Sequence, residues 1–196
     1  MIELQSPYRQ ATQEDAVAMS ELVNMAGEGL PYYLWSQMIE DNESAWDVGQ
    51  NRAKRESGGF SYRNTIVREE GNCVVACLIG YALSDKPDSD IYQDLPAMFI
   101  PLQELEDLAC STWYVNVLAT YPEFRGKGYG VEFLQLAEQI SHDNNLLGIS
   151  VIVSDGNPGA RRLYERHGFI EKASRAMVKN DWENDGSNWV LLTREW

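Results

Sequence analysis

The most constraining feature of the sequence is a buried strand that runs through a glycine-rich basic turn into an amphipathic helix. Residues 113–120, WYVNVLAT, are rich in aromatic and β-branched side chains, which is typical of a buried strand. Glycines then alternate with other residues in RGKGYG, residues 125–130. From residue 130 to residue 144, apolar side chains recur at three-residue steps opposite a polar side, so a helix is expected there.

The glycine-rich turn has the composition of an anion-binding site. Glycines let the backbone turn sharply and leave its N–H groups uncovered, and the start of a helix adds unpaired donors and a partial positive charge. Arg125 and Lys127 bring two full positive charges, so a pyrophosphate is the expected occupant. The turn is not a Walker A loop, because Gly128 follows Lys127, and its GxGxG spacing is not that of a dinucleotide fingerprint.

The remaining pattern predicts helices first and strands after them. Residues 12–55 are expected to be helical with breaks at residues 27–31, and residues 64–83 to form a hairpin. Residues 84–108 are expected to form an acidic loop, either without regular structure or with a short helical turn. A strand is expected over residues 149–153, a helix opening at residues 157–158, and closing strands over residues 169–178 and 188–193. This alternation of strands and helices is an α/β arrangement.

Length, composition and charge limit the number of domains and the partners that this chain is expected to have. A chain of 196 residues with 44% hydrophobic and 23% charged residues has the size and composition of one globular domain, so we predict a single domain over residues 1–196. The net charge of −14 argues against a nucleic-acid partner. The longest apolar stretch, residues 73–83, is shorter than the roughly 20 residues that cross a bilayer, so no membrane partner is expected. The N-terminus lacks a signal-peptide pattern, and a cytoplasmic location is expected.

Disulfide and metal chemistry are not expected. The cysteines Cys73, Cys77 and Cys110 are odd in number and form no CxxC pair, and the chain has only two histidines. Cys73 and Cys77 lie in an apolar strand pattern, so both thiols are expected to be buried.

Two segments together resemble the signature of the GNAT superfamily of N-acetyltransferases. Residues 125–130 fit its [QR]xxGx[GA] motif, and residues 157–169, NPGARRLYERHGF, look like its N-x-x-A-x-x-x-Y-x-x-x-G-F segment. The two motifs occur in the family's order, and the resemblance covers most of the chain. It implies an α/β (α+β) fold with a mixed, mostly antiparallel sheet of six or seven strands, flanked by helices and splayed between strands four and five.

The resemblance also implies acetyl-coenzyme A (acetyl-CoA) as cosubstrate, without a metal. In the family, the pantetheine arm pairs with exposed backbone of the fourth strand, and the pyrophosphate lies on the glycine-rich turn. Asn157 would contact the cofactor arm, and Arg161 would reach toward the phosphates, with a solvated helix face as the alternative for this arginine. The cofactor-binding residues implied in this way are Leu118, Ala119, Thr120, Arg125, Gly126, Lys127, Gly128, Tyr129, Gly130, Asn157 and Arg161.

The resemblance implies that Tyr164 is the general acid. A phenol with a pKa of about 10 is neutral at pH 7 and can donate a proton to a departing thiolate, while packing between helix and sheet is the alternative role. The fourth strand has no carboxylate, so the general base stays open among Glu104, Glu106 and Asp107, each of which could instead be a surface charge. Asn116 can orient a water but cannot take a proton.

The acceptor pocket of this family is built largely by the N-terminal helices. Here Glu28 could pair with an ammonium group, and Tyr32 and Tyr33 could wall a pocket, with core packing as the alternative for each ring. The expected function is direct transfer of acetyl from acetyl-CoA to a primary amine of a small molecule or peptide. A non-catalytic acyl-CoA-binding sensor or regulatory module is the alternative. The identity of the amine and a homodimeric state stay open.

Overall fold

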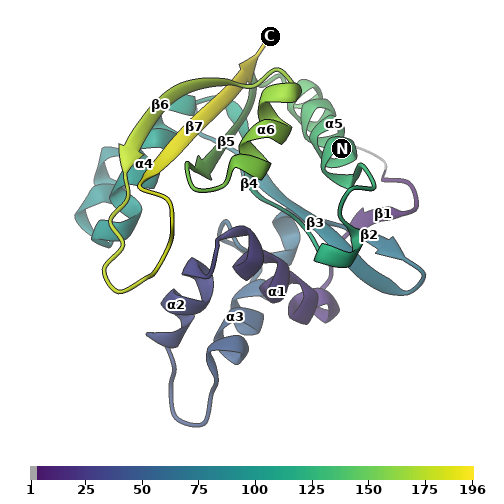
Figure 1. The fold of residues 1–196 in the computed structure, drawn as a ribbon, viewed down its shortest axis with the longest axis vertical. Coiled ribbons are helices and arrows are strands. Elements are labelled where there is room, and N and C mark those ends of the chain that lie inside the picture. The colour runs from purple at the N-terminus through teal and green to yellow at the C-terminus, as the bar shows by residue number, and fades with distance from the viewer. Residues whose placement is uncertain (1–3) are drawn as a thin grey trace. The chain divides into compact units, whose positions relative to one another are not determined.

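In a computed structural model, residues 4–196 are described, apart from the side chain of Ser89, and they form two compact units (Figure 1). The N-terminal unit comprises the described residues up to Gly80 together with Asn116–Phe133. The C-terminal unit comprises Tyr81–Val115 and Leu134–Trp196. The prediction of a single domain over residues 1–196 stays a prediction.

The N-terminal unit combines three helices with antiparallel strands. Its elements are β1 (Tyr8–Gln10), α1 (Ala16–Ala26), α2 (Leu30–Ser36), α3 (Ala45–Ala53), β2 (Thr65–Glu70) and most of β3 (Cys73–Ala82). The three helices and the hairpin lie where the sequence pattern predicts them. Strand β1 is an addition, because three residues are too short to show a strand period in the sequence.

The C-terminal unit carries the later helices and strands. Its elements are α4 (Ile100–Glu106), β5 (Gly148–Ser154), α6 (Pro158–Arg166), β6 (Ile170–Ala176) and β7 (Asn188–Glu195). Strand β4 (Thr112–Thr120) and helix α5 (Tyr129–Asp143) contribute residues to both units. The segment over residues 84–108, expected to be a loop with at most a short helical turn, contains the helix α4. This helix begins in the Ile100–Pro101 dipeptide because proline is tolerated in the first turn of a helix.

The strands form a seven-stranded sheet in the order β1-β2-β3-β4-β5-β7-β6. Strands β1, β2 and β3 pair antiparallel in succession, and β7 pairs antiparallel with β5 and β6. The pair β4–β5 is parallel, with a register that runs from Thr112↔Gly148 to Val115↔Val151. The predicted mixed, mostly antiparallel sheet flanked by helices, with a splay between strands four and five, is confirmed.

The core of the N-terminal unit lies between its helices and its strands. Met19 and Leu22 of α1 and Val67 of β2 are fully buried there, and Val117 and Ala119 of β4 join the same cluster. Gly49 lets α3 approach the indole of Trp35, since a Cβ at this position would lie 2.5 Å from the ring. Alternation along β4 therefore sends Val117 and Ala119 into the core and leaves the side chains between them on the other face.

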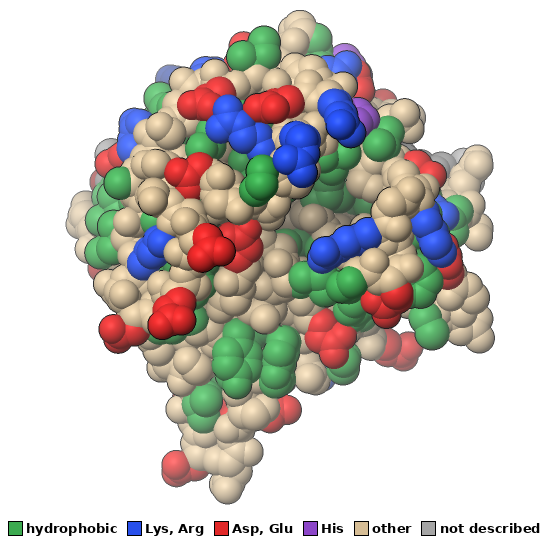
Figure 2. Space-filling model, viewed as in Figure 1, with side chains coloured by type: hydrophobic (Ala, Val, Ile, Leu, Met, Phe, Trp, Pro, Cys, Tyr) green, Lys and Arg blue, Asp and Glu red, His purple; other side chains and the backbone are tan. Residues whose placement is uncertain are grey.

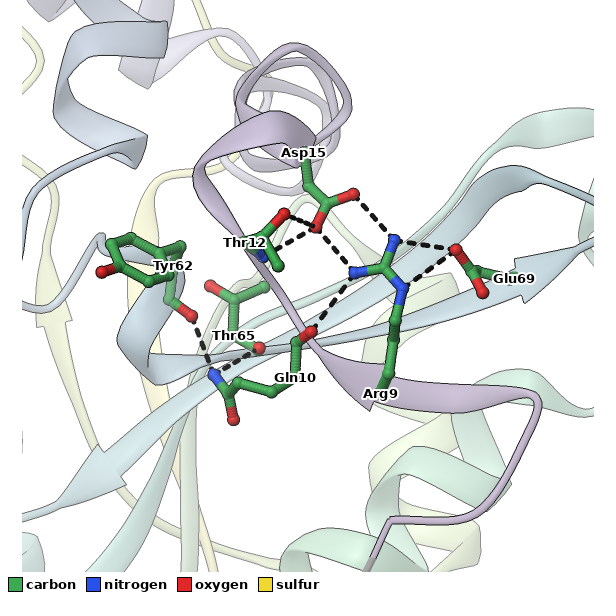
Figure 3. A network of polar contacts seen from close by, with 7 residues as sticks. All are labelled: Arg9, Gln10, Thr12, Asp15, Tyr62, Thr65 and Glu69. Atoms are coloured by element: carbon green, nitrogen blue, oxygen red, sulfur yellow. Dashed lines mark hydrogen bonds and ion pairs between the residues drawn. The ribbon is translucent and has the colours of Figure 1, made fainter.

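A polar network fixes β1 against β2 and the start of the helical segment (Figure 3). The Arg9 guanidinium donates to both Asp15 oxygens at 2.8 and 2.9 Å and to Glu69 at 2.8 Å. Asp15 also accepts from the backbone N–H of Thr12 at 2.8 Å. Burial opposes the charge of Asp15, but the hydrogen bonds from Arg9 and Thr12 outweigh it, so the pKa of this carboxyl lies below its ordinary value.

The thiols differ from the prediction in one respect. Cys77 is buried in β3, and burial raises the pKa of its thiol to about 12. Cys73 is exposed, contrary to expectation, because it is the first residue of β3 and follows the turn at Gly71 directly. All three cysteines are free.

Candidate functional site

The glycine-rich turn of the N-terminal unit has an open backbone. Strand β4 ends at Thr120, and α5 begins at Tyr129. Between them, Gly126 and Gly128 have φ values of +77° and +91°, and a Cβ added at either position would meet nothing within 4 Å. The left-handed backbone explains the need for glycine, and the empty space above it lets a ligand approach the backbone closely.

Backbone donors of this turn are available to a ligand. Among residues 4–196, no backbone or side-chain group accepts from the N–H groups of Gly126, Lys127 and Gly128. The Gly128 carbonyl accepts from Val131 and Glu132, so the helix starts directly after the turn. Unpaired N–H groups beside a helix start favour an anion, and a pyrophosphate fits such a site.

The two cations of the turn make contacts within the protein. The Arg125 side chain donates to the Thr120 carbonyl at 3.1 Å and lies 3.0 Å from the Met25 sulfur. The Lys127 ammonium is 3.1 Å from Glu70 and lies over the Phe124 ring. The Lys127–Glu70 pair is exposed, and an exposed pair contributes only about 0–1 kcal/mol, so Lys127 can leave it for a phosphate.

Arg68 of β2 supports the first turn of α5, a role that sequence reasoning missed. Its guanidinium lies 3.8 Å from the centre of the Tyr129 ring and 3.0 Å from a Glu132 oxygen. The Tyr8 hydroxyl also donates to Glu132, and burial together with this bond raises the pKa of Tyr8 to about 12. The Tyr129 ring is buried under Arg68, so Tyr129 offers its backbone rather than its phenol to a ligand. The contact joins residues that are far apart in the sequence, so no local spacing predicts it.

The predicted cofactor residues of β4 divide between two faces. Ala119 places its methyl group in the core, so its backbone alone is available to a ligand. Asn116, Leu118 and Thr120 are half-buried on the opposite face. These strand residues lead directly into the turn, so the structure brings them together with Arg125–Gly130 in the N-terminal unit.

The predicted acceptor residues lie at the start of α2. Gly29 has a φ of +87°, and α2 begins at Leu30 immediately after it. Tyr32 is exposed, and its ring lies 5.2 Å from that of Trp46, while Tyr33 is half-buried. Glu28 precedes this bend. The aromatic contacts belong to the packing of α2 on α3.

Helix α6 of the C-terminal unit carries the second motif. The Asn157 side chain caps the helix by accepting from the Ala160 N–H at 3.0 Å. Arg161 pairs with Glu165 at 2.7 Å and with Glu171 at 2.6 Å. Figure 2 shows basic side chains gathered over this helix with acidic ones beside them. The basic segment is thus partly neutralised by its own neighbours.

Tyr164 lies on the buried side of α6. Its side chain is 5% exposed, and its ring lies 5.5 Å from that of Phe169. Within the described part of the chain, no group forms a hydrogen bond with its hydroxyl, and solvent reaches the hydroxyl oxygen. Burial raises the pKa of Tyr164 above its ordinary value, so the phenol holds its proton at neutral pH.

The three acids proposed as bases differ in their partners. Glu104 lies 2.5 Å from the Arg175 guanidinium, and Asp107 accepts from Tyr92 at 2.6 Å and from Gln103 at 2.9 Å. Glu106 is half-buried at the end of α4. Across residues 4–196 there is no cluster of His, Cys, Asp and Glu side chains that could hold a metal ion. In the same range, no helix has both the length and the hydropathy required to span a bilayer.

Comparison with known proteins settles the family. The family model described as Acetyltransferase (GNAT) family matches residues 31–169. This chain is a member of the GNAT acetyltransferase family. The matched range contains the turn at Arg125–Gly130 as well as the segment from Asn157 to Phe169. A search of curated proteins finds no match.

Solved structures share this GNAT fold at low sequence identity. An N-acetyltransferase from Staphylococcus aureus Mu50 is 21% identical with a TM-score of 0.65, over 95% of this chain and 99% of that one. Ard1 from Thermoplasma volcanium is 16% identical with a TM-score of 0.57, over 96% of this chain and 95% of that one. A GNAT family acetyltransferase from Elizabethkingia anophelis with acetyl-CoA bound is 16% identical with a TM-score of 0.50, over 67% of this chain and 75% of that one.

Proposed function

We propose that this protein transfers the acetyl group of acetyl-CoA to a primary amine of a small molecule or peptide. The observation that carries the proposal is the open row of N–H groups at Gly126, Lys127 and Gly128, directly before α5. Such a row can bind a doubly charged group without breaking a hydrogen bond of the protein, because these donors have no acceptor in the described chain. Family membership supplies the reaction class.

The pyrophosphate would be held by the backbone of Arg125–Gly130, with the side chains of Arg125 and Lys127 adding charge. Backbone groups of Leu118, Ala119 and Thr120 would pair with the pantetheine arm. Asn157 keeps its helix-capping role while its amide nitrogen stays available for the cofactor arm. Arg161 already has two carboxylate partners, so its contact with the phosphates stays a prediction of the motif.

Tyr164 is proposed as the general acid. The thioester supplies an activated acetyl group and a thiolate leaving group, which needs a proton as it departs. Tyr164 carries that proton at neutral pH, and no partner in the described chain competes for its hydroxyl. Buried protonated phenols that lack a partner are suited to protonate a charge that develops beside them.

Release of free thiol tests the proposal. The intact protein is incubated with acetyl-CoA and, in turn, with spermidine, kanamycin and a short peptide with a free amino terminus. We expect at least one of these amines to raise thiol release well above the rate with acetyl-CoA alone and to appear as an acetylated product by mass spectrometry. Calorimetric binding of acetyl-CoA without thiol release from any amine would contradict catalysis and favour the sensor alternative.

A further inference from the structure

We propose that Glu106, at the end of α4, is the general base that takes the proton from the acceptor ammonium. The inference rests on the proposed acetyl transfer and adds to it a residue, a proton route and a place for the amine. Helix α4 lies between β3 and β4 in the chain and packs against β6 and β7. The amine would accordingly approach the C-terminal unit at the end of this helix.

The three acids near the start of β4 are distinguished by their partners. Glu104 is neutralised by Arg175, and Asp107 is engaged by Tyr92 and Gln103. In the described residues, Glu106 has neither a hydrogen bond nor an ion pair. A carboxylate that is engaged by a cation or by two donors is a poor base, because the same contacts that hold it also stabilise its charged form.

Packing explains why Glu106 is half-buried without a partner. The preceding residue, Leu105, is fully buried in a cluster with Ala109 and with Leu191 of β7. This anchor fixes the end of α4, and the Glu106 side chain next to it is half-buried. The Glu106 side chain is half-buried while solvent still reaches its carboxylate oxygens, so an acceptor amine or a water can reach them too. A half-buried acid with a perturbed pKa is a candidate for function.

Glu106 shares its surroundings with the proposed acid. The rings of Tyr81 and Tyr114 meet edge to face at 5.6 Å, and the charge of Glu106 acts on both phenols. Tyr114 also lies within the electrostatic reach of Tyr164. The proposed base, the proposed acid and the phenol of Tyr114 all belong to the C-terminal unit.

The charged groups around Glu106 favour a proton on it near neutral pH. Arg175 of β6 is occupied by Glu104, and the residues of β7 that pack on this cluster, Leu191 and Trp189, carry no charge. Burial and the negative charge of Asp107 raise the pKa of Glu106 to about 7. A carboxyl group with this pKa is charged often enough at pH 7 to act, and it is more basic than an exposed one.

The proton and electron balance is complete without a further reactant. Glu106 takes a proton from the ammonium, directly or through one water, and becomes a carboxylic acid. The freed amine nitrogen bonds to the thioester carbonyl carbon, and the carbon–sulfur bond then breaks with its electron pair on sulfur. Tyr164 gives its proton to the thiolate and recovers one from the nitrogen of the new amide, while Glu106 returns its proton to solvent.

A pH profile of kcat/KM separates a base from a structural residue. The wild type, Glu106→Gln and the matched control Glu104→Gln are compared with the amine that gives the fastest thiol release, and acetyl-CoA binding is measured for each by calorimetry. We expect wild-type kcat/KM to rise with pH and level off above about 7, as Glu106 ionises. Glu106→Gln should lose about 100-fold at pH 7 and the rise with pH, with acetyl-CoA affinity unchanged. Glu104→Gln should keep the rise.

The possible outcomes each decide a separate question. An unchanged pH profile in Glu106→Gln, or loss of the rise in Glu104→Gln instead, overturns the role of Glu106 and leaves the proposed acetyl transfer standing. Absence of thiol release from wild type with every amine overturns both. If thermal unfolding shows that Glu106→Gln does not fold, Glu106→Asp replaces it. That variant keeps a carboxylate on a shorter arm and should retain the rise with reduced turnover, and loss of the rise there contradicts the proposal.

Discussion

Asp15 and Glu106 are both acids taken out of solvent beside a short helix, and their surroundings are opposite. Asp15 in the N-terminal unit receives two hydrogen bonds from Arg9 and one from the Thr12 backbone (Figure 3). Glu106 in the C-terminal unit is half-buried and has, in the described chain, no side-chain hydrogen bond or ion pair. The pKa of Asp15 is lowered by its donors, against the effect of burial, whereas burial raises that of Glu106.

The difference separates acids that hold the fold from acids that are free to react. A fully bonded carboxylate stabilises the elements that supply its donors, and it resists protonation. An unpartnered acid that is partly removed from water lowers the stability of the folded state, and such acids are enriched at functional sites. The contrast extends to phenols, since the Tyr62 hydroxyl donates to Glu56 at 2.6 Å while that of Tyr164 has no partner in the described residues.

The largest effect is expected from removing the unpartnered phenol. Tyr164→Phe should lower kcat by about 100-fold, because the thiolate then leaves without a positioned proton donor. Acetyl-CoA affinity should stay within about twofold in calorimetry, since the ring is kept. The matched control, Tyr62→Phe, removes a hydroxyl that has a hydrogen-bond partner and should leave kcat unchanged. Full turnover in Tyr164→Phe would remove the tyrosine from the mechanism.

Substituting the two acids should have different effects on the free energy of unfolding. Asp15→Asn should lower the free energy of unfolding by about 2 kcal/mol, because the guanidinium of Arg9 loses a charged partner and the cap at Thr12 weakens. At neutral pH, Glu106→Gln should raise it, since no partner is lost and the cost of holding a charge in a half-buried place is removed. Urea unfolding of both variants measures the difference. Equal losses would show that Glu106 has a structural role like that of Asp15.

The pH dependence of stability should also have opposite signs. The stabilisation from Asp15 is present above its unfolded pKa of 3.8 and is lost as pH falls through its lower folded value. Glu106 has its pKa raised from 4.5 to about 7, so its contribution is full below 4.5 and is lost as pH rises toward 7. Unfolding free energies of wild type minus each variant, from about pH 3 to pH 8, should show both trends. A flat difference for Glu106→Gln between 4.5 and 7 would contradict its raised pKa.

The smallest effect concerns the exposed pair beside the glycine turn. Glu70→Gln releases Lys127, so acetyl-CoA should bind about two- to threefold more tightly at low salt, and the gain should shrink at high salt. Calorimetry at two salt concentrations measures this change. Weaker binding in the variant would mean that Glu70 positions Lys127 rather than competing for it.

Local patterns in the sequence predict most of the fold and the open glycine-rich turn. The Arg125–Gly130 turn has positive φ at Gly126 and Gly128, and glycine is the residue that favours this backbone conformation, so the sequence itself indicates the turn. The Asn157–Pro158 start of α6 is similarly a local signal.

Features that depend on distant partners could not be read from the sequence. Arg68 reaches Tyr129 and Glu132 from a strand some sixty positions away in the chain, and no spacing records this contact. The choice among Glu104, Glu106 and Asp107 depends on Arg175 and Tyr92, which the fold brings to two of them. The length and bounds of helix α4 could not be predicted, because its segment carries acidic residues and prolines that are typical of loops.

Calorimetry with acetyl-CoA on the wild type, Gly128→Ala and Gly58→Ala tests the central claim most directly. Gly128 and Gly58 have φ values of +91° and +93°, and neither would meet an atom within 4 Å of an added Cβ, so alanine imposes the same backbone strain at both. The account predicts binding by wild type, a loss of about tenfold or more in Gly128→Ala, where the methyl group fills the anion site, and wild-type affinity in Gly58→Ala. No uptake of acetyl-CoA by wild type, or equal affinity in all three proteins, would contradict it.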